Sequence, residues 1–600
     1  MITPAKRNRR RCGAGKFTSL TVVSQSKKRL GIAWMMSESS DGTTRTFSAV
    51  GLLSSSPFID RGIIMKIRAL FVIPVLIVAA VGCSSDDTSS DSSTVESSAP
   101  LTDTEAPSTE APTTTVFAPE PVGINDVGET TVEGPVTGGG GQVIFGTAAF
   151  DGTPFGYTEE EFFISGTANS YTSAEPLSQG GMWTVTPKDT AEYKTRILVR
   201  RPTTATEFNG TVYVEWLNVT AGLDTGPTWS LSWVEMLRQG SVWVGVSTQR
   251  VGVEGGGNKM GEFRVLKIAD PERYGTLNHP GDNYSYDIFS QAGATVWNQA
   301  DTILGGLEPT TVIGMGESQS AFRMTTYLNA VAPMHDAYSG YLVHSRGARG
   351  ANLYCATNCA DPGDASDVKG PEVALIRTDL KRPVLNFSSE TDVVGTNLGY
   401  RKAEQPDTDF FRSWEVTGTA HGDAYSLGIG DSDTGSGNGD QGLFDAQFGA
   451  PSSVYMGIIE CGLPINAGPH TYVLRSAIQA LETWVLTGLP PKSMPKLENN
   501  ADLTGFNLDA QGNALGGIRT PYVDVPLAAL SGIGQEGGSF CGLFGTTRSF
   551  TTDELTALYP TADDFIAKWN AATDAAVESG AILAVDAEHI KAAGASYAAR

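Results

Sequence analysis

The chain has 600 residues, with 66 Asp and Glu against 42 Lys and Arg, which gives a formal net charge of −24. Nucleic acid and anionic lipid would both repel so acidic a protein, so we exclude them as expected partners. Of the 42 basic residues 13 lie in the first 82 positions, where only 3 acidic residues occur, so the rest of the chain is more acidic still.

Residues 65–82 have the pattern of a signal peptide. A short basic start precedes an apolar run that is too short for a stable membrane span. Residues 80–83 resemble a bacterial lipobox, so we expect Cys83 to be lipidated; an ordinary secretory signal is the alternative. Residues 1–64 are arginine-rich without sustained periodicity, and we interpret them as an upstream extension, with translation starting at Met65 or, alternatively, with a genuine cytoplasmic segment.

Residues 83–140 are predicted to form a disordered tether. They consist mainly of Ser, Thr, Asp, Glu, Pro and Ala, and such a segment cannot bury enough apolar surface to offset its ordering entropy. We therefore expect a folded body over residues 141–600, outside the cytoplasmic membrane and attached to it through the lipid anchor alone.

Four cysteines follow Cys83, and an even number in an exported protein suggests disulfides. The short spacing favours a bond between Cys355 and Cys359, which leaves Cys461 to pair with Cys541; free thiols are the alternative. The spacing lacks a second close pair or the histidines of a zinc site, so no metal is expected.

The folded body starts with two strands of alternating polarity, near residues 161–166 and 193–201, which is typical of antiparallel strands with one solvated face. Later strands are more continuously apolar, as in a sheet covered on both faces. They are expected near residues 210–218, 241–247, 310–316, 337–343, 382–388 and 410–416. Helices are expected at 229–239, 285–299 and 472–486.

Ser318 lies where a β-branched run meets a helical pattern, in the sequence TTVIGMGESQSAFRMTTYL of residues 310–328. This layout is typical of a nucleophile elbow, whose strained turn requires small residues two positions before and after the serine. Gly316 and Ser320 occupy those positions. The pattern predicts that Ser318 is a nucleophile.

A serine nucleophile needs a base and an acid, which in this plan follow it in the chain, each after a strand. Asp392 follows the strand that ends near residue 388, and Glu390 is the alternative acid. His421 follows the next strand and is the predicted base. Of the other histidines, His344 and His470 could line the pocket, although we expect a structural hydrogen-bonding role for each.

An acyl-transfer site also needs two backbone N–H donors for the oxyanion. The residue after the nucleophile, Gln319, should supply one of them. The second is expected near Asn218 and Val219, in the loop after the strand near residues 210–218.

Several motifs together resemble a branch of bacterial α/β-hydrolase domain proteins: VEWLNV (214–219), VGVSTQ (244–249), GESQSA (316–321), LVHSRG (342–347), SETD (389–392), GTAHGD (418–423), GIRTPYVDVP (517–526) and FCGLFGTT (540–547). The likeness covers about residues 145–600. It implies an α/β-hydrolase fold with a mostly parallel central sheet, antiparallel N-terminal strands, helices on both faces and a cap insertion. It also implies a Ser–acid–His set, carried here by Ser318, Asp392 and His421.

Two insertions are expected in this domain, near residues 345–381 and 426–465. The first holds Cys355 and Cys359 at the place where this fold usually inserts a cap. The second contains an Asp- and Gly-rich stretch, residues 426–442, that lacks the closing glutamate of a calcium loop, so we interpret it as a surface insertion.

These observations predict an extracytoplasmic serine hydrolase that acts on a small-molecule carboxylic ester through an acyl-enzyme, without a cofactor. A peptidase or amidase is the nearest alternative, because the same triad serves both reactions. A catalytically silent cell-surface binding protein with the same fold is the alternative from another class.

Overall fold

The computed structural model describes residues 120–141, 151–356, 367–395, 398–455, 457, 459–538 and 540–598. All of them belong to one compact unit, Ala106–Arg600. The predicted extension, signal peptide and lipidation site at Cys83 lie outside the described residues, as does Cys359.

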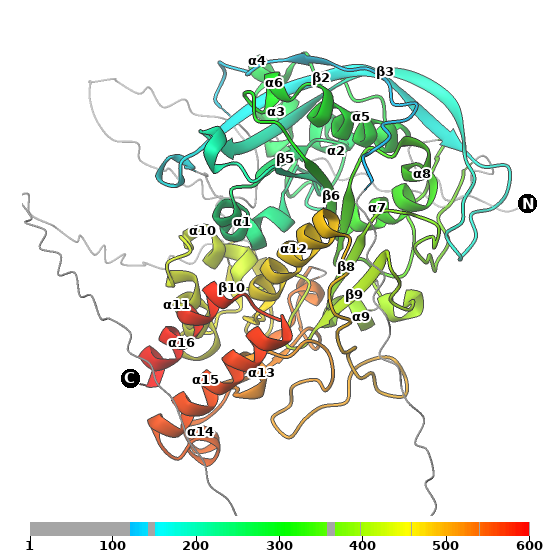
Figure 1. Ribbon diagram of the computed structural model, residues 1–600. Coiled ribbons are helices and arrows are strands. Elements are labelled where there is room, and N and C mark those ends of the chain that lie inside the picture. Colours follow the sequence, from blue (N-terminus) through cyan, green and yellow to red (C-terminus); the bar gives the residue numbers. More distant parts are fainter. Residues whose placement is uncertain are drawn as a thin grey trace, which may run out of the picture. The chain divides into compact units, whose positions relative to one another are not determined.

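A nine-stranded sheet runs through the described part of the chain, in the order β1-β2-β3-β5-β4-β6-β7-β8-β9 (Figure 1). The six strands from β5 to β9 are mutually parallel, whereas β1, β2 and β3 pair antiparallel. Their bounds are β1 Thr131–Glu133, β2 Tyr157–Thr172, β3 Thr186–Pro202, β4 Thr211–Trp216, β5 Val242–Val246, β6 Thr311–Glu317, β7 Gly340–His344, β8 Val384–Ser389 and β9 Phe411–Val416. The predicted mostly parallel sheet with antiparallel N-terminal strands is confirmed.

The first two predicted strands are longer than their sequence patterns indicated. β2 and β3 pair from Tyr157 opposite Pro202 to Thr172 opposite Thr186, with a register shift between Asn169 and Tyr171. Their ends are polar, so hydrophobic alternation marks only the middle of this hairpin. Backbone hydrogen bonding extends it beyond the part that side chains reveal.

The folded body also begins earlier than residue 141, the predicted boundary. β1 pairs with β2 at Val132 opposite Ile164. Upstream of it, the Arg382 side chain donates hydrogen bonds to the carbonyl oxygens of Glu120 and Pro121. Arg273 likewise donates to the carbonyl oxygens of Val136 and Gly138. Backbone pairing and arginine side chains therefore hold a segment whose composition alone predicted disorder.

Helices cover both faces of the sheet, as predicted. On one face lie α1 (Pro227–Gln239) and α12 (His470–Thr487), and on the other lie α5 (Ser285–Asn298) and α7 (Gln319–Ala330). β4 serves both layers, because Tyr213 joins the first core and its neighbours Val212 and Val214 join the second.

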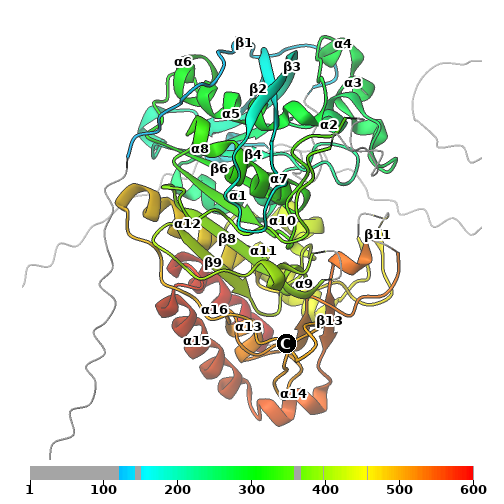
Figure 2. The same ribbon diagram turned by 90° about the vertical axis from the view of Figure 1, so that its right-hand side faces the viewer.

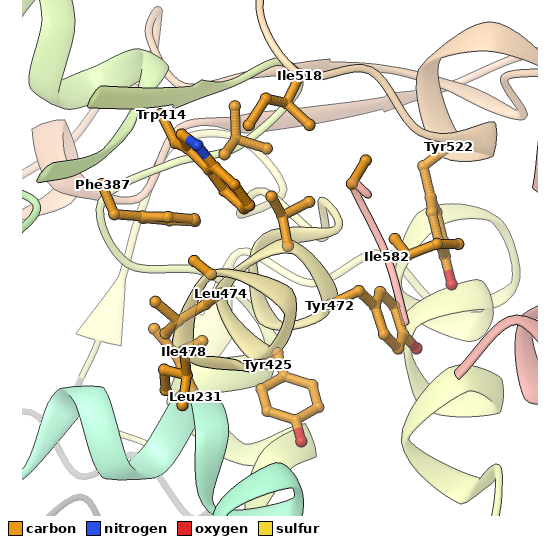
Figure 3. Close-up of a cluster of buried hydrophobic side chains, with 14 of the residues drawn as sticks. Leu231, Phe387, Trp414, Tyr425, Tyr472, Leu474, Ile478, Ile518, Tyr522 and Ile582 are labelled. Carbon is orange, nitrogen blue, oxygen red and sulfur yellow. The ribbon is translucent and has the colours of Figure 1, made fainter. Parts of the chain in front are cut away.

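The core beneath α12 joins distant parts of the chain. Figure 3 shows Leu474 and Ile478 on this helix beside Leu231 of α1, with Phe387 and Trp414 facing them from the sheet. All five side chains are at most 2% exposed, so α12 is held by close packing against two strands and a neighbouring helix.

The C-terminal helices extend the same core. They are α13 (Pro521–Asp524), α14 (Thr552–Leu558), α15 (Ala562–Ser579) and α16 (Ala584–Ala598), near a two-stranded sheet of β12 (Ala528–Ser531) and β13 (Thr546–Ser549) (Figure 2). The shorter elements are α2 (Arg250–Glu254), α3 (Leu266–Ala269), α4 (Pro271–Tyr274), α6 (Ala300–Ile303), α8 (Ala332–His335), α9 (Glu390–Val394), α10 (Gly430–Ser432), α11 (Asn438–Phe444), β10 (Val454–Tyr455) and β11 (Ile459–Glu460).

Candidate active site

Ser318 lies in a sharp turn between β6 and α7. Its backbone has φ 55° and ψ −116°, a left-handed conformation that is strained for a residue with a side chain. The turn brings α7 so close to β6 that a Cβ on Gly316 would lie 2.8 Å from Met324 Cγ and 3.2 Å from Ser320 Cβ. The small residues of the motif are therefore explained by this close approach.

The structure brings Ser318, His421 and Asp392 together. Ser318 Oγ lies 2.7 Å from His421 Nε2, and His421 Nδ1 lies 2.6 Å from Asp392 Oδ1. Each follows a strand of the parallel sheet, respectively β6, β9 and β8. These are the distances that proton transfer from a serine to an oriented imidazole requires.

Asp392 is fully buried and held from two directions. While Oδ1 faces His421, Oδ2 accepts hydrogen bonds from the Ser389 backbone N–H (2.6 Å) and hydroxyl (2.9 Å). Asp392 thus belongs to the capping box at the start of α9. The capping contacts set the carboxylate in place for the imidazole.

Glu390, the alternative acid, bonds backbone amides, whereas His421 Nδ1 is bonded to Asp392. Its two oxygens accept hydrogen bonds from the backbone N–H groups of Gly418 (2.6 Å) and Gly532 (2.8 Å). Burial raises the pKa of Glu390 to about 7. This carboxyl ties the loop before His421 to a C-terminal segment, which is a structural task.

A second carboxyl group, Glu317, also reaches the imidazole, and sequence reasoning missed it. Glu317 Oε1 lies 3.2 Å from His421 Nε2, while Oε2 accepts a hydrogen bond from Asn218 Nδ2 (3.0 Å). Its one signal in the sequence is its position directly before Ser318.

The two carboxyls change the proton affinity of His421. Burial lowers the pKa of His421, but the nearby charges of Asp392 and Glu317 outweigh burial and raise the pKa above its usual range. Burial also raises the pKa of Glu317. The imidazole is therefore a stronger base than an exposed histidine.

The predicted oxyanion donors differ in whether the backbone N–H already has a hydrogen-bond acceptor. The Asn218 N–H donates to the Thr225 carbonyl (2.9 Å), and its side chain is bonded to Glu317. Within the described residues, no hydrogen bond occupies the N–H of Val219 or of Gln319, the first residue of α7. Of the three predicted donors, Val219 and Gln319 therefore keep an N–H without a protein acceptor among the described residues, as an oxyanion donor requires, whereas Asn218 does not.

His344 and His470 form a buried pair beside the site. Their Nε2 atoms are 2.9 Å apart, His344 Nδ1 lies 3.2 Å from Thr228 Oγ1, and His470 Nδ1 lies 3.0 Å from the Ala420 carbonyl. Burial lowers the pKa of each. The pair contacts the residue before His421 and does not line the pocket, in keeping with the expected structural role.

A pocket of about 400 Å³ opens at Ser318 and His421. Its lining comes mainly from residues 218–231, 421–427, 459–460 and 538–544, with Met260. The insertion at 426–465 therefore contributes to the wall. No described residue of 345–381, where a cap was expected, lines this pocket; side chains such as Leu353 and Ile376 are packed in the core beneath α5 and α7 instead.

A disulfide joins Cys461 to Cys541, with a Cα–Cα distance of 5.6 Å, as predicted. Cys541 itself lines the pocket. Cys355 is also disulfide-bonded, but its predicted partner lies outside the described residues.

A larger cavity, of about 910 Å³, lies elsewhere, near the starts of β6, β8 and β9. Thr311, Pro383 and Phe410 contribute to it, whereas none of the predicted site residues does. Across the part of the chain that the structure describes, no cluster of His, Cys, Asp and Glu could hold a metal ion, and no helix is both long and apolar enough to cross a bilayer.

Comparison with known proteins gives one family and several solved structures. The family model described as alpha/beta hydrolase domain matches residues 132–592. A glucuronoyl esterase from Solibacter usitatus is 10% identical, over 50% of this chain and 84% of its own, with a TM-score of 0.23. Acetyl xylan esterase 1 from Thermoanaerobacterium sp. JW/SL YS485 is 11% identical, over 42% and 80%, with a TM-score of 0.21.

Oligopeptidase B from Leishmania major is 12% identical, over 32% of this chain and 20% of its own, with a TM-score of 0.18. At such identities these structural matches say nothing of the reaction. No curated protein matches the chain.

Proposed function

Because the chain belongs to the alpha/beta hydrolase domain family, we propose that it is a serine hydrolase that cleaves carboxylic esters through an acyl-enzyme. One observation carries the proposal: Ser318 Oγ, His421 and Asp392 form a hydrogen-bonded chain of 2.7 Å and 2.6 Å at the base of a pocket. No such chain is needed for a purely structural or binding role.

In the first half of the proposed reaction, Ser318 Oγ attacks the ester carbonyl carbon as His421 Nε2 takes the hydroxyl proton. Asp392 holds the imidazole and stabilises its charged form. The carbonyl oxygen becomes an oxyanion that the N–H groups of Gln319 and Val219 would bind. The intermediate collapses, the bond to the alcohol breaks, and His421 returns the proton to the departing alkoxide.

In the second half, water replaces the alcohol. His421 removes a proton from water, the hydroxide attacks the acyl carbon, and the bond to Ser318 Oγ breaks. The proton returns to Ser318, and the carboxylic acid leaves. Every step uses side chains and water alone, so the proposal requires no cofactor.

An active-site serine probe tests the proposal. A fluorophosphonate should label the wild-type protein, whereas Ser318→Ala should not be labelled and His421→Ala should be labelled far more slowly. Ser432→Ala, at an exposed serine outside the pocket, is the matched control and should be labelled normally. Labelling that persists in Ser318→Ala, or no labelling of the wild type, would refute the assignment. A panel of paired esters and amides then separates esterase from amidase activity.

We further propose that the enzyme acts outside the cytoplasmic membrane as a lipoprotein. Two features support this: the signal-like residues 65–82 before Cys83, and the Cys461–Cys541 disulfide, which favours an oxidising compartment. Mass spectrometry of the mature N-terminal peptide should find lipid on Cys83, and Cys83→Ser should move the protein from the membrane fraction. Unmodified Cys83 in native material would contradict it.

A further inference from the structure

We infer that the pocket selects esters whose enclosed group is uncharged and apolar, of about a dozen non-hydrogen atoms or fewer. The inference rests on the proposed hydrolase function and deepens it by naming the substrate class. The cavity volume of about 400 Å³, at roughly 30 Å³ for each water-sized group, sets the upper limit.

One wall of the pocket is a small hydrophobic cluster separate from the two main cores. We call it the apolar wall and define it by Leu427, Ile459, Phe540, Leu543 and Phe544, all of which line the pocket. Four of the five are only partly buried, so the cluster keeps apolar surface that is not covered by the protein. An apolar substrate group would cover that surface.

Three further apolar side chains line the pocket, beside the polar side chains of Thr220, Thr225 and Ser230. Pro227 and Leu231 come from α1, and Met260, which is 45% exposed, comes from the loop before α3. Together with the apolar wall they favour a substrate group that requires few hydrogen bonds, because an enclosed polar group without partners is penalised.

The charged residues in the lining also favour an uncharged substrate group. Among the described lining residues there is no Lys or Arg, and His421 is the one basic side chain. Glu317 and Glu460 add carboxyls to the lining. A carboxylate or phosphate on the enclosed group would therefore lose its hydration without gaining a cation.

The apolar wall is tied to the reacting groups. The Gly422 N–H donates to the Leu543 carbonyl (3.0 Å), so the residue after His421 is bonded to the wall. The Cys461–Cys541 disulfide fixes the ends of the segments that carry Ile459 and Phe540. A group that packs against the wall is thus held beside Ser318 and His421.

Two ester series measure the selectivity, one with a constant p-nitrophenol and straight acyl chains from two to twelve carbons, the other with constant acetate and straight alcohols. In the series that varies the enclosed group, kcat/KM should rise about fourfold for each added methylene until the pocket is full. The methyl p-nitrophenyl diester of succinate should exceed p-nitrophenyl hemisuccinate, its anionic counterpart, by about 10²-fold or more. A flat response in both series, or a preference for the anion, would overturn the inference.

Leu543→Ala tests the apolar wall directly. The ratio of kcat/KM for an eight-carbon chain to that for a two-carbon chain should fall about tenfold. Leu508→Ala, at a leucine that is 58% exposed and outside the lining, is the matched control and should leave the ratio unchanged. Equal ratios in the two variants would contradict the assignment of the wall.

Calorimetry with Ser318→Ala separates this inference from the proposed reaction, since it requires no turnover. 2-Decanone should bind at least about 10²-fold more tightly than acetone. If 2-decanone binds more tightly than acetone by this factor but the fluorophosphonate does not label the wild type, the hydrolase proposal fails and the pocket assignment stands. Equal binding of the two ketones overturns the pocket assignment.

Discussion

Two buried polar networks in this protein use similar residues for different ends. In the β2–β3 hairpin region, Arg196 pairs with Glu161 (3.3 Å) and Asp224 (2.7 Å), and these three side chains are at most 3% exposed. None of them lines the pocket at Ser318. In the other network, His421 stands between the carboxyls of Asp392 and Glu317 and opens onto that pocket.

The difference shows that buried charge alone does not identify a functional site. In the hairpin network a permanent cation is matched by anions, so removal of a member should cost stability. In the His421 network the central group can gain or lose a proton beside Ser318, the proposed nucleophile, so removal of a member should cost activity. The four predictions below test this division.

The largest expected effect is that of Asp392→Asn. Without the carboxylate that orients the imidazole, kcat should fall about 10⁴-fold, while the melting temperature changes little. Glu390→Gln is the matched control: Glu390 lies two residues before Asp392 but accepts its hydrogen bonds from the backbone amides of Gly418 and Gly532. In this variant kcat should fall less than about tenfold. Steady-state kinetics on both variants checks the prediction. An equal loss of kcat in the two variants would contradict the assignment of Asp392, rather than Glu390, as the acid.

Arg196→Ala should mainly lower stability. The change leaves Asp224 buried without its cation, whereas Glu161 keeps its ion pair with Arg273 (2.6 Å). The free energy of unfolding should therefore fall by about 3–5 kcal/mol. Denaturant unfolding measures the loss, and kcat per folded molecule should stay near that of the wild type. A variant of normal stability but low activity would contradict the division between the two networks.

Removal of the Cys461–Cys541 disulfide should affect both properties. The bond joins residues 80 positions apart, and replacement of both cysteines with serine should reduce the free energy of unfolding by about 2–4 kcal/mol. Because Cys541 lines the pocket, selectivity for chain length should also weaken. Thermal unfolding measures the stability, and the ester series measure the chain-length selectivity. An unchanged free energy of unfolding would contradict a stabilising role of the disulfide.

Glu317→Gln should have the smallest effect, a shift in the pH profile. The reaction requires neutral His421, so kcat/KM rises as pH increases through the pKa of His421. The charged Glu317 favours the imidazolium and raises that pKa. Loss of the charge should therefore move the acidic limb to lower pH, by about one unit. Asp423→Asn, near His421 in sequence but without contact to its ring in the structure, is the control; an unmoved limb in Glu317→Gln would show that Glu317 does not act on His421.

Features that depend on local chain geometry were well predicted from the sequence. The order of apolar strands and helices specified a mostly parallel sheet because side-chain periodicity follows secondary structure. Gly316 and Ser320 indicated the turn at Ser318, since only small residues at these positions allow α7 to approach β6 so closely. Chain order then led to His421, which the structure brings within 2.7 Å of Ser318, because acid and base are expected after successive parallel strands.

The limits of prediction lie where side chains from distant segments meet. Asp392 and Glu390 are two residues apart, and only the folded α9 shows that one faces His421 while the other bonds Gly418 and Gly532. Composition also predicted disorder for the segment at residues 120–141, because composition does not reveal its partners, which are β2 and the side chains of Arg273 and Arg382.

By itself, then, the sequence determined the fold class, the nucleophile elbow and the order of its partners, because these follow from backbone geometry and local periodicity. Only the tertiary structure decided which carboxyl orients His421, that Glu317 is a second neighbour, that the Asn218 amide is occupied and that residues 427, 459 and 540–544 form one wall. Those properties depend on distances between segments that no local pattern encodes.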